Sequence, residues 1–287
     1  MNQLCVESDL SLQVRGKTIV ARRWGSPTGK PVLALHGWLD NANSFELLAP
    51  LLHNVDLIAL DLAGHGQSSH RSGDATYNIW DDIPEIIMIA DQLGWETFTL
   101  LGHSRGAIIS MLVAGTFPER ISQAVMLDGF WPEPVVPADG PKQLAQAILD
   151  DAKPRRRPTE NKNIGIFILA RKNGTFSLSR DAAKRLTCRG LRQVPGGYVW
   201  STDPRLRNSS AVKLTQSHID AFLDAITAKV LVVLADKGIP LMSDKDAAAI
   251  RARGNFKVEV LPGSHHFHLE QSTVVKVAET INSFINS

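Results

Sequence analysis

The stretch that decides the fold is Leu100-Leu101-Gly102-His103-Ser104-Arg105-Gly106-Ala107. It contains the pattern Gly-x-Ser-x-Gly, follows an apolar run at 98–101 and precedes an apolar stretch with helical spacing at 107–117. A serine on a tight turn from strand to helix has its hydroxyl lifted clear of the sheet, and the flanking glycines avoid collisions with neighbouring backbone. The context predicts that Ser104 is a nucleophile. Without catalysis, the same glycines would form a simple strand-to-helix turn.

Short apolar runs alternate with helical patterns along most of the chain. Runs rich in β-branched residues predict strands at 10–14, 18–24, 32–35, 57–60, 98–101, 124–127, 230–234 and 258–261. Helical spacing predicts helices at 79–93, 107–117, 244–253 and 273–284. From residue 32 onward the strand runs are almost wholly apolar, which is typical of parallel strands covered on both faces. The first two runs are mixed in polarity and favour an antiparallel edge hairpin. We therefore expect a mostly parallel α/β sheet.

One region interrupts this alternation. Residues 132–218 are rich in proline and arginine and lie between two predicted core strands. Residues 133–215 hold 16 Lys and Arg against 7 Asp and Glu, whereas the whole chain has a net charge of +2. This asymmetry indicates a separate subdomain. We expect a core of residues 1–131 and 219–287, with 132–218 inserted as a lid. Its basic residues would form a solvated outer face or attract anionic substrates.

With these motifs the chain resembles the α/β-hydrolase superfamily over residues 15–131 and 219–287. The stretch Asp61-Leu62-Ala63-Gly64-His65-Gly66-Gln67-Ser68 is similar to a superfamily turn that is usually structural. The stretch His36-Gly37-Trp38-Leu39-Asp40-Asn41-Ala42-Asn43-Ser44-Phe45 resembles the serine hydrolase-like proteins. The resemblance implies the α/β-hydrolase fold, with an eight-stranded sheet, helices on both faces and an inserted lid. It also implies esterase-type or related chemistry, and a serine nucleophile argues against epoxide hydrolases and dehalogenases.

The resemblance further implies an oxyanion hole made of two backbone N–H groups. One comes from the loop that follows the strand at 32–35, and the other from the residue after the nucleophile. These positions are Trp38 and Arg105. One such donor is typically worth about 3 kcal/mol in the transition state. The Arg105 guanidinium either faces the cleft, where it would bind an anionic substrate group, or pairs with a neighbouring acid. We favour the second interpretation.

The general base is expected in the loop after the last strand. A serine hydroxyl needs a base, normally histidine, and this loop reads Pro262-Gly263-Ser264-His265-His266-Phe267-His268-Leu269-Glu270. A glutamate five residues after the base is common in the superfamily, and the serine hydrolase-like pattern is Gly-x-His-x-x-His. Both select His265, whereas the usual spacing from Pro262 selects His266. We predict His265 as the base, His266 as the alternative, and His268 as a packing or capping residue.

The acid that should orient the base departs from the usual pattern. The superfamily most often carries it in the loop after the seventh strand, but Gly238 stands at that position here. Asp236 lies two residues earlier, and Asp128 ends the apolar run at 124–127. A carboxylate at the end of an apolar strand costs free energy unless it finds a hydrogen-bond partner, and a catalytic histidine would be one. We predict Asp128 as the acid and keep Asp236 as the alternative.

These residues predict a serine hydrolase that cleaves a carboxylic ester or thioester of a small molecule through an acyl-enzyme. We expect no cofactor and no metal, because neither metal-ligand spacing nor a dinucleotide fingerprint is present. We expect no nucleic-acid partner. Two alternatives stay open. One is a cofactor-free perhydrolase or haloperoxidase that uses the same triad, and the other is a non-catalytic, ligand-binding relative.

Composition also suggests a compartment. The chain has two cysteines, Cys5 and Cys188, far apart in sequence, which favours a reducing environment over a disulfide framework. Its first residues lack the basic and apolar segments of a signal peptide. No apolar run approaches the roughly 20 residues needed to span a bilayer. We therefore expect a cytoplasmic protein without a membrane span.

Overall fold

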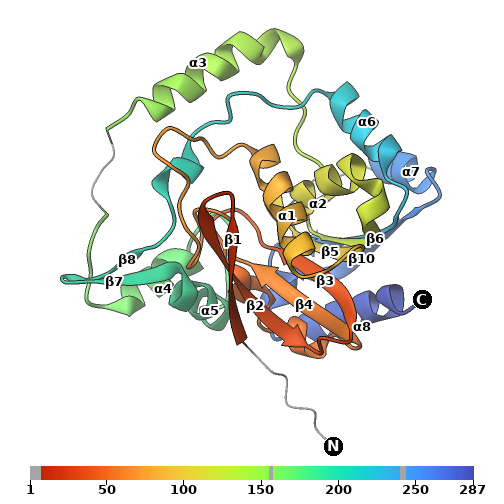
Figure 1. Ribbon diagram of the computed structural model, residues 1–287, viewed down its shortest axis with the longest axis horizontal. Coiled ribbons are helices and arrows are strands. Elements are labelled where there is room, and N and C mark those ends of the chain that lie inside the picture. The colour runs from red at the N-terminus through yellow and green to blue at the C-terminus, as the bar shows by residue number, and fades with distance from the viewer. Residues whose placement is uncertain (1–7, 155–157, 240–243) are drawn as a thin grey trace, which may run out of the picture.

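The computed structural model describes residues 8–154, 158–239 and 244–287. Its centre is an eight-stranded sheet with the order β1-β2-β4-β3-β5-β6-β9-β10 (Figure 1). Every predicted strand run lies in one of these strands, which are β1 Ser8–Val14, β2 Lys17–Gly25, β3 Lys30–Leu35, β4 Val55–Leu60, β5 Phe98–His103, β6 Ile121–Leu127, β9 Lys229–Lys237 and β10 Phe256–Ser264. The predicted α/β-hydrolase fold class is confirmed.

Strand direction divides the sheet into two parts. β1 pairs antiparallel with β2, and β2 pairs antiparallel with β4, which confirms the predicted edge hairpin. All remaining neighbours are parallel. Parallel strands place their carboxyl ends at one edge of the sheet, where open α/β sheets bind ligands. The segments that follow β3, β5, β6 and β10 therefore meet at this edge.

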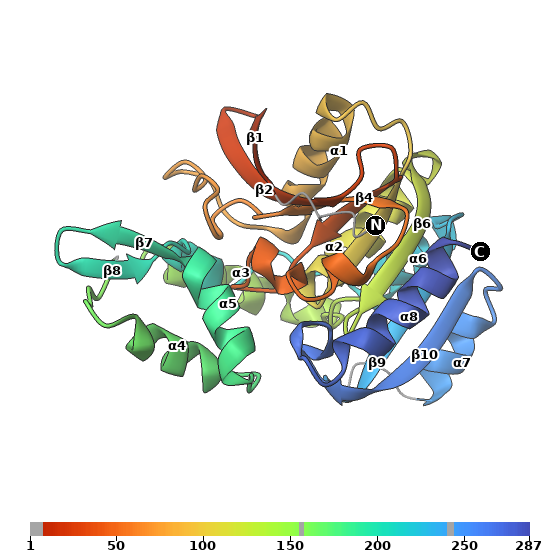
Figure 2. The ribbon, with the colours of Figure 1, turned by 90° about the horizontal axis from the view of Figure 1, so that it is seen from below.

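Helices cover both faces of the sheet (Figures 1 and 2). Along β3, Leu33 and Leu35 belong to one buried cluster, and Val32 and Ala34 belong to the other, because successive side chains alternate between faces. The first cluster includes apolar residues of α1, α2 and α6, and the second includes those of α8. These helices and α7 have the bounds α1 Asp82–Gln92, α2 Arg105–Thr116, α6 Gln216–Ala225, α7 Asp244–Arg251 and α8 Val274–Ile285. None of the helices in the described ranges is long and apolar enough to cross a membrane.

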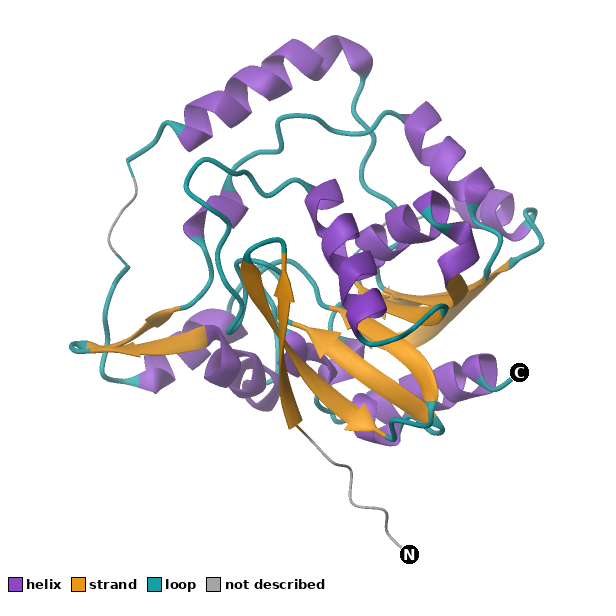
Figure 3. Ribbon diagram, viewed as in Figure 1, coloured by secondary structure: helices purple, strands orange, loops and turns teal. Residues whose placement is uncertain are grey.

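The segment between β6 and β9 has secondary structure of its own (Figure 3). It contains α3 Gly140–Asp151, α4 Ile164–Lys172, α5 Arg180–Gly190 and an antiparallel hairpin of β7 Leu191–Val194 and β8 Gly197–Trp200. Figure 2 shows the hairpin, α4 and α5 projecting to one side of the sheet. The boundary expected at residue 218 falls inside α6. Ile219 and Leu223 of that helix are buried in the main core, so α6 is part of the helix layer.

Candidate active site

Ser104 occupies a strained turn between β5 and α2. Its backbone has φ 51° and ψ −117°, a left-handed conformation that non-glycine residues rarely adopt. A Cβ on Gly106 would collide with the carbonyl oxygen of Leu35, and one on Gly129 would lie 2.7 Å from Ser104 Cα. The Ser104 N–H donates to Leu127 O at 2.9 Å, which ties the turn to β6. The neighbouring backbone therefore leaves room only for glycine and holds the serine in place.

His265 and Asp128 form a buried pair at the same edge of the sheet. His265 Nδ1 lies 2.6 Å from Asp128 Oδ2. Because an ionised carboxylate only accepts hydrogen bonds, the imidazole carries its proton on Nδ1 and leaves Nε2 free. Asp128 follows β6 with φ 40°, and His265 follows β10. The Asp128 carboxylate is 0% exposed, and its cost of burial is offset by the hydrogen bonds it accepts.

The backbone around Asp128 explains why position 238 holds a glycine. The Asp128 carboxylate accepts hydrogen bonds from Ala235 N and Ile239 N, each at 3.0 Å. A Cβ on Gly238 would collide with both carboxylate oxygens. Asp128 therefore fills the space that a side chain at 238 would otherwise enter. The acid missing from the loop after β9 is replaced in space by the acid at the end of β6.

Neither of the two alternative residues takes part in the His265–Asp128 pair, although His266 lines the same cavity as His265. Asp236 is exposed, and its Oδ1 accepts a hydrogen bond from Gly263 N at 2.8 Å. This bond links the carboxyl ends of β9 and β10 without reaching an imidazole. His266 is buried, and its Nε2 lies 3.1 Å from Asp40 Oδ2. His266 therefore has a carboxylate partner of its own, which sequence reasoning missed although Asp40 lies within the stretch that resembles serine hydrolase-like proteins.

Ser104 and His265 line the same cavity, which has a volume of about 610 Å³. Among the described residues, the Ser104 hydroxyl has no hydrogen-bond partner, and the side chain is partly exposed to this cavity. Catalytic hydrogen bonds are often long before substrate binds and tighten in the Michaelis complex. The segment after β6 closes the other side with Ile166, Phe167, Ala170, Arg171, Phe176 and Trp200. The Phe176 ring lies over His265, with 4.0 Å between ring centroids.

Two backbone amides at the site are available to bind an oxyanion. The N–H groups of Trp38 and Arg105 donate to no acceptor among the described residues. Arg105 is the first residue of α2, where the helix N-terminus favours negative charge. Its guanidinium points to Asp82, 2.8 Å away, which is the arrangement we favoured from sequence. The Trp38 side chain is 44% exposed, and its indole N–H donates to Leu206 O at 2.9 Å.

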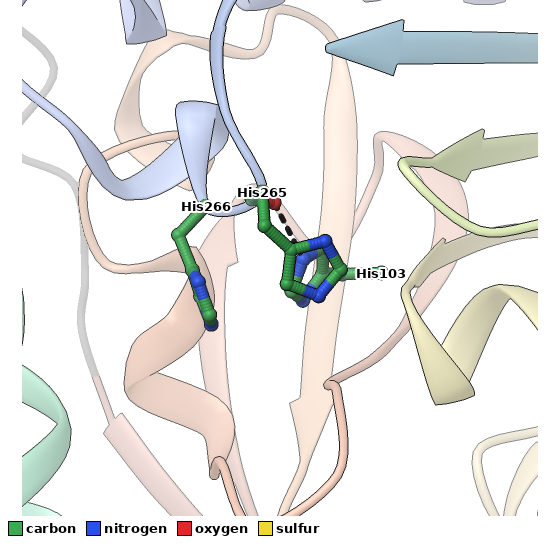
Figure 4. Close-up of side chains that lie close together, drawn as sticks. All are labelled: His103, His265 and His266. Atoms are coloured by element: carbon green, nitrogen blue, oxygen red, sulfur yellow. Dashed lines mark hydrogen bonds between the residues drawn. The ribbon is translucent and has the colours of Figure 1, made fainter. Parts of the chain in front are cut away.

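Four buried histidines lie together at the site, and two of them, His265 and His266, line the cavity. The His103 ring lies between 4.2 and 4.8 Å from those of His265, His266 and His268. Figure 4 shows three of them, with His103 Nε2 donating to His265 O at 2.9 Å. Burial, and to a smaller extent the neighbouring imidazoles, lowers the pKa of His103, His266 and His268 well below its usual value. His268 also bonds Ser44 Oγ, so it packs as predicted.

Three of these rings come close enough to be considered for a metal ion. One ligand nitrogen each from His103, His265 and His266 lies within 4.8 Å of the others. Each ring uses one nitrogen in a hydrogen bond to Asp128, Asp40 or a backbone carbonyl, as metal-bound histidines also do. Each ring thus has a single nitrogen left, and a metal on Nε2 of His265 would occupy the atom that a general base needs.

The turn after β4 is structural, as its resemblance implies. The Asp61 carboxylate accepts hydrogen bonds from Ala42 N and Gln67 N and is paired with Arg189 of α5. A Cβ on Gly66 would collide with this carboxylate. Asp61 therefore connects β4, the loop after β3 and the segment after β6, and it does not line the cavity.

Comparisons with known proteins agree with the observed fold. The sequence model of the family described as "alpha/beta hydrolase fold" matches residues 30–272. Serine hydrolase-like protein 2 from Homo sapiens is 30% identical over 300 residues, covering 97% of this chain and 94% of its own. Serine hydrolase-like protein from Danio rerio is 30% identical over 264 residues, covering 88% and 81%.

Solved structures are similar over nearly the whole chain. A hypothetical protein from Pseudomonas aeruginosa PAO1 is 40% identical with a TM-score of 0.93, covering 98% of this chain and 100% of its own. The thioesterase domain from the curacin biosynthetic pathway has a TM-score of 0.82 with the same coverage. At 23% identity, this second likeness concerns the fold alone.

Proposed function

The chain belongs to the α/β-hydrolase fold family, and on that premise we propose that it is a serine esterase with Ser104, His265 and Asp128 as its catalytic triad. The substrate is a small molecule with a carboxylic ester or thioester, which is cleaved through an acyl-enzyme. The observation that carries this proposal is the buried His265–Asp128 pair at 2.6 Å, whose histidine lines the same cavity as the strained Ser104.

The first half of the reaction forms the acyl-enzyme. Nε2 of His265 is free to accept the Ser104 proton because Nδ1 donates to Asp128. The serine oxygen then attacks the ester carbonyl, and the Trp38 and Arg105 amides stabilise the oxyanion. The carboxylate of Asp128 stabilises the imidazolium that results. His265 then protonates the leaving alcohol or thiol as the tetrahedral intermediate collapses.

The second half hydrolyses the acyl-enzyme. Water enters beside His265, which removes a proton as the water oxygen attacks the acyl carbonyl. The same amides hold the second oxyanion, and His265 returns the proton to Ser104. A cavity of about 610 Å³ falls within the range of small-molecule sites. The insertion residues that close it support a lid role for the segment after β6.

The non-catalytic alternative depended on the missing acid at 238. Asp128 occupies that space and bonds His265, so this reason for a vestigial site no longer holds. The perhydrolase alternative uses the same triad and differs only in the nucleophile that attacks the acyl-enzyme. Hydrogen peroxide added with an ester substrate tests it, because a perhydrolase would convert the acyl group to a peracid.

A fluorophosphonate probe tests the activated serine directly. Wild-type protein should be labelled and should hydrolyse p-nitrophenyl esters of short acyl chains, and Ser104→Ala should lose both activities. Ser217→Ala, which changes an exposed serine on α6, is the matched control and should behave as wild type. Folded wild-type protein that is neither labelled nor active on esters and thioesters would refute the proposal.

A further inference from the structure

Two arginines of one short turn have opposite environments. The turn at Pro204–Arg207 begins with the side chain of Asp203 accepting a hydrogen bond from Arg205 N. The Arg205 guanidinium is buried, paired with Asp203, and also donates to three backbone carbonyls. Arg207, two residues later, is exposed and has no ion pair or hydrogen bond from its side chain to any described residue. The turn is thus rigidly held while one of its cations remains available.

The available cation lies beside the proposed catalytic site. Arg207 lines the cavity that contains Ser104 and His265. It also lines an adjoining cavity of about 380 Å³ on the Arg105 side of Trp38. The Trp38 indole donates to Leu206 O, so the residue before Arg207 is bonded directly to the residue whose amide we place in the oxyanion hole. The turn therefore has a fixed position relative to Trp38.

A second cation lines the same cavity. Arg171 of α4 retains 19% exposure of its side chain and is paired with the buried carboxylate of Asp40. Burial, and then the positive charge of Arg207, lowers the pKa of Arg171 to about 10. Two guanidinium groups thus face one cavity closely enough to repel each other. An anion bound between them would relieve this repulsion.

The acidic residues that line the cavity do not neutralise Arg207. Asp40 is bonded to Arg171 through one oxygen and to His266 through the other. Asp203 is bonded to Arg205 and Tyr77. In the adjoining cavity, Arg105 is paired with Asp82, and Glu133 and Lys213 also line the wall with opposite charges. Positive charge without a partner therefore remains at Arg207.

We propose that the substrate carries an anionic group, a carboxylate or a phosphate, which Arg207 binds while the ester carbonyl lies at Ser104. This inference rests on the proposed esterase function and names the substrate class for the same site. The planar guanidinium suits either anion, because it presents paired donors to two oxygens. Arg171, which lines the same cavity, contributes electrostatic attraction. Neutral esters would leave Arg207 without a partner and are expected to be poorer substrates.

The experiment compares esters that differ only in charge. The p-nitrophenyl half-ester of glutaric acid is measured against its methyl-capped form, and a phosphate-terminated ester of similar length forms a third arm. We expect wild-type kcat/KM to favour a charged ester by about 10-fold or more, since charge-assisted hydrogen bonds are the stronger class. The better of the two charged arms identifies the anion. Arg207→Gln should reduce the preference by about 10-fold, and Arg207→Lys should retain part of it.

Arg192→Gln is the matched control. It removes the same charge from the exposed face of the β7–β8 hairpin, away from both cavities, and should leave the preference unchanged. An equal preference in wild type and Arg207→Gln, or a wild-type preference for the neutral ester, would overturn the inference and leave the esterase function standing. If wild type cleaves no ester, calorimetric binding of glutarate and of inorganic phosphate decides. Equal affinity in wild type and Arg207→Gln, or no binding, would then overturn it.

Discussion

Replacing Asp128 by asparagine tests the triad most sharply, because the change preserves shape and removes charge. The carboxylate accepts three hydrogen bonds, from Ala235 N, Ile239 N and His265 Nδ1. An amide has only one oxygen, so whichever way it is turned, its NH2 group faces at least one N–H donor. Leaving a buried donor unsatisfied costs about 1–3 kcal/mol. We therefore expect Asp128→Asn to lower the free energy of unfolding by that amount and still fold.

The catalytic loss should be larger than the stability loss. Asparagine cannot stabilise the imidazolium, and it favours the wrong tautomer of His265. In Ser-His-Asp triads this exchange lowers kcat about 10⁴-fold, equivalent to about 5 kcal/mol. The assay is kcat and KM on a p-nitrophenyl ester, beside urea unfolding to show that the variant is folded. Asp236→Asn, on the exposed neighbouring carboxylate, should stay within about 3-fold of wild type.

The collision at Gly238 allows a second test of the same reasoning. Gly238→Asp alone should be destabilised by about 1–3 kcal/mol, because the new side chain overlaps the Asp128 carboxylate. Asp128→Gly removes that obstacle and suits the positive φ of 40°. The double variant Asp128→Gly/Gly238→Asp should then recover about 10-fold or more of the kcat lost in Asp128→Gly. A folded Asp128→Asn variant with wild-type kcat would refute the assignment of the acid.

Three further predictions concern the surroundings of the site. Gly129→Ala places a Cβ 2.7 Å from Ser104 Cα, so the turn must shift, and kcat/KM should fall about 100-fold. Asp40→Asn removes the buried carboxylate that pairs with Arg171. The free energy of unfolding, measured by urea titration, should therefore fall by about 3 kcal/mol. His268 has a folded-state pKa below the value of about 6.5 expected when unfolded. The stability that buried, neutral His268 provides is therefore fully present above about pH 6.5. As the pH falls below it, the unfolded chain binds a proton that the folded chain does not, and stability decreases by up to about 1.4 kcal/mol per pH unit. Urea titrations at several pH values should show a shallower decrease in His268→Asn than in wild type.

Each of these predictions has a contrary outcome. Wild-type kcat/KM in Gly129→Ala would show that the turn does not depend on this close approach. Lys276→Gln, at an exposed ion pair on α8, is the control for Asp40→Asn and should change the free energy of unfolding by less than about 1 kcal/mol. A loss as small as this in Asp40→Asn would contradict the importance of the buried Asp40–Arg171 pair. The same pH dependence in His268→Asn and wild type would mean that other groups account for acid destabilisation.

The local pattern of the sequence predicted the strands and the candidate nucleophile. Continuous apolar runs such as 98–101 are typical of parallel strands that helices cover on both faces. The number of strands and the mostly parallel type of the sheet could therefore be predicted. Ser104 could be proposed as the nucleophile because its glycines and the strand before it are contiguous in sequence. The helices and hairpin after β6 were not predicted. α3 and α4 each bury a single side chain, Ala147 and Phe167, so packing against the core constrains few of their positions.

Tertiary structure decided the partners of these residues. Asp128 and His265 are 137 positions apart, and only the parallel register of β6, β9 and β10 brings them to 2.6 Å. The resemblance to the superfamily indicated that an acid should stand near position 238, and the sequence has a glycine there. Whether Asp128 or Asp236 filled the gap depended on which carboxylate faced the imidazole, a property of strand ends and backbone angles that no local pattern records. The same long-range packing pairs His266 with Asp40 and His268 with Ser44. It also leaves Arg207 without an ion pair to any described residue.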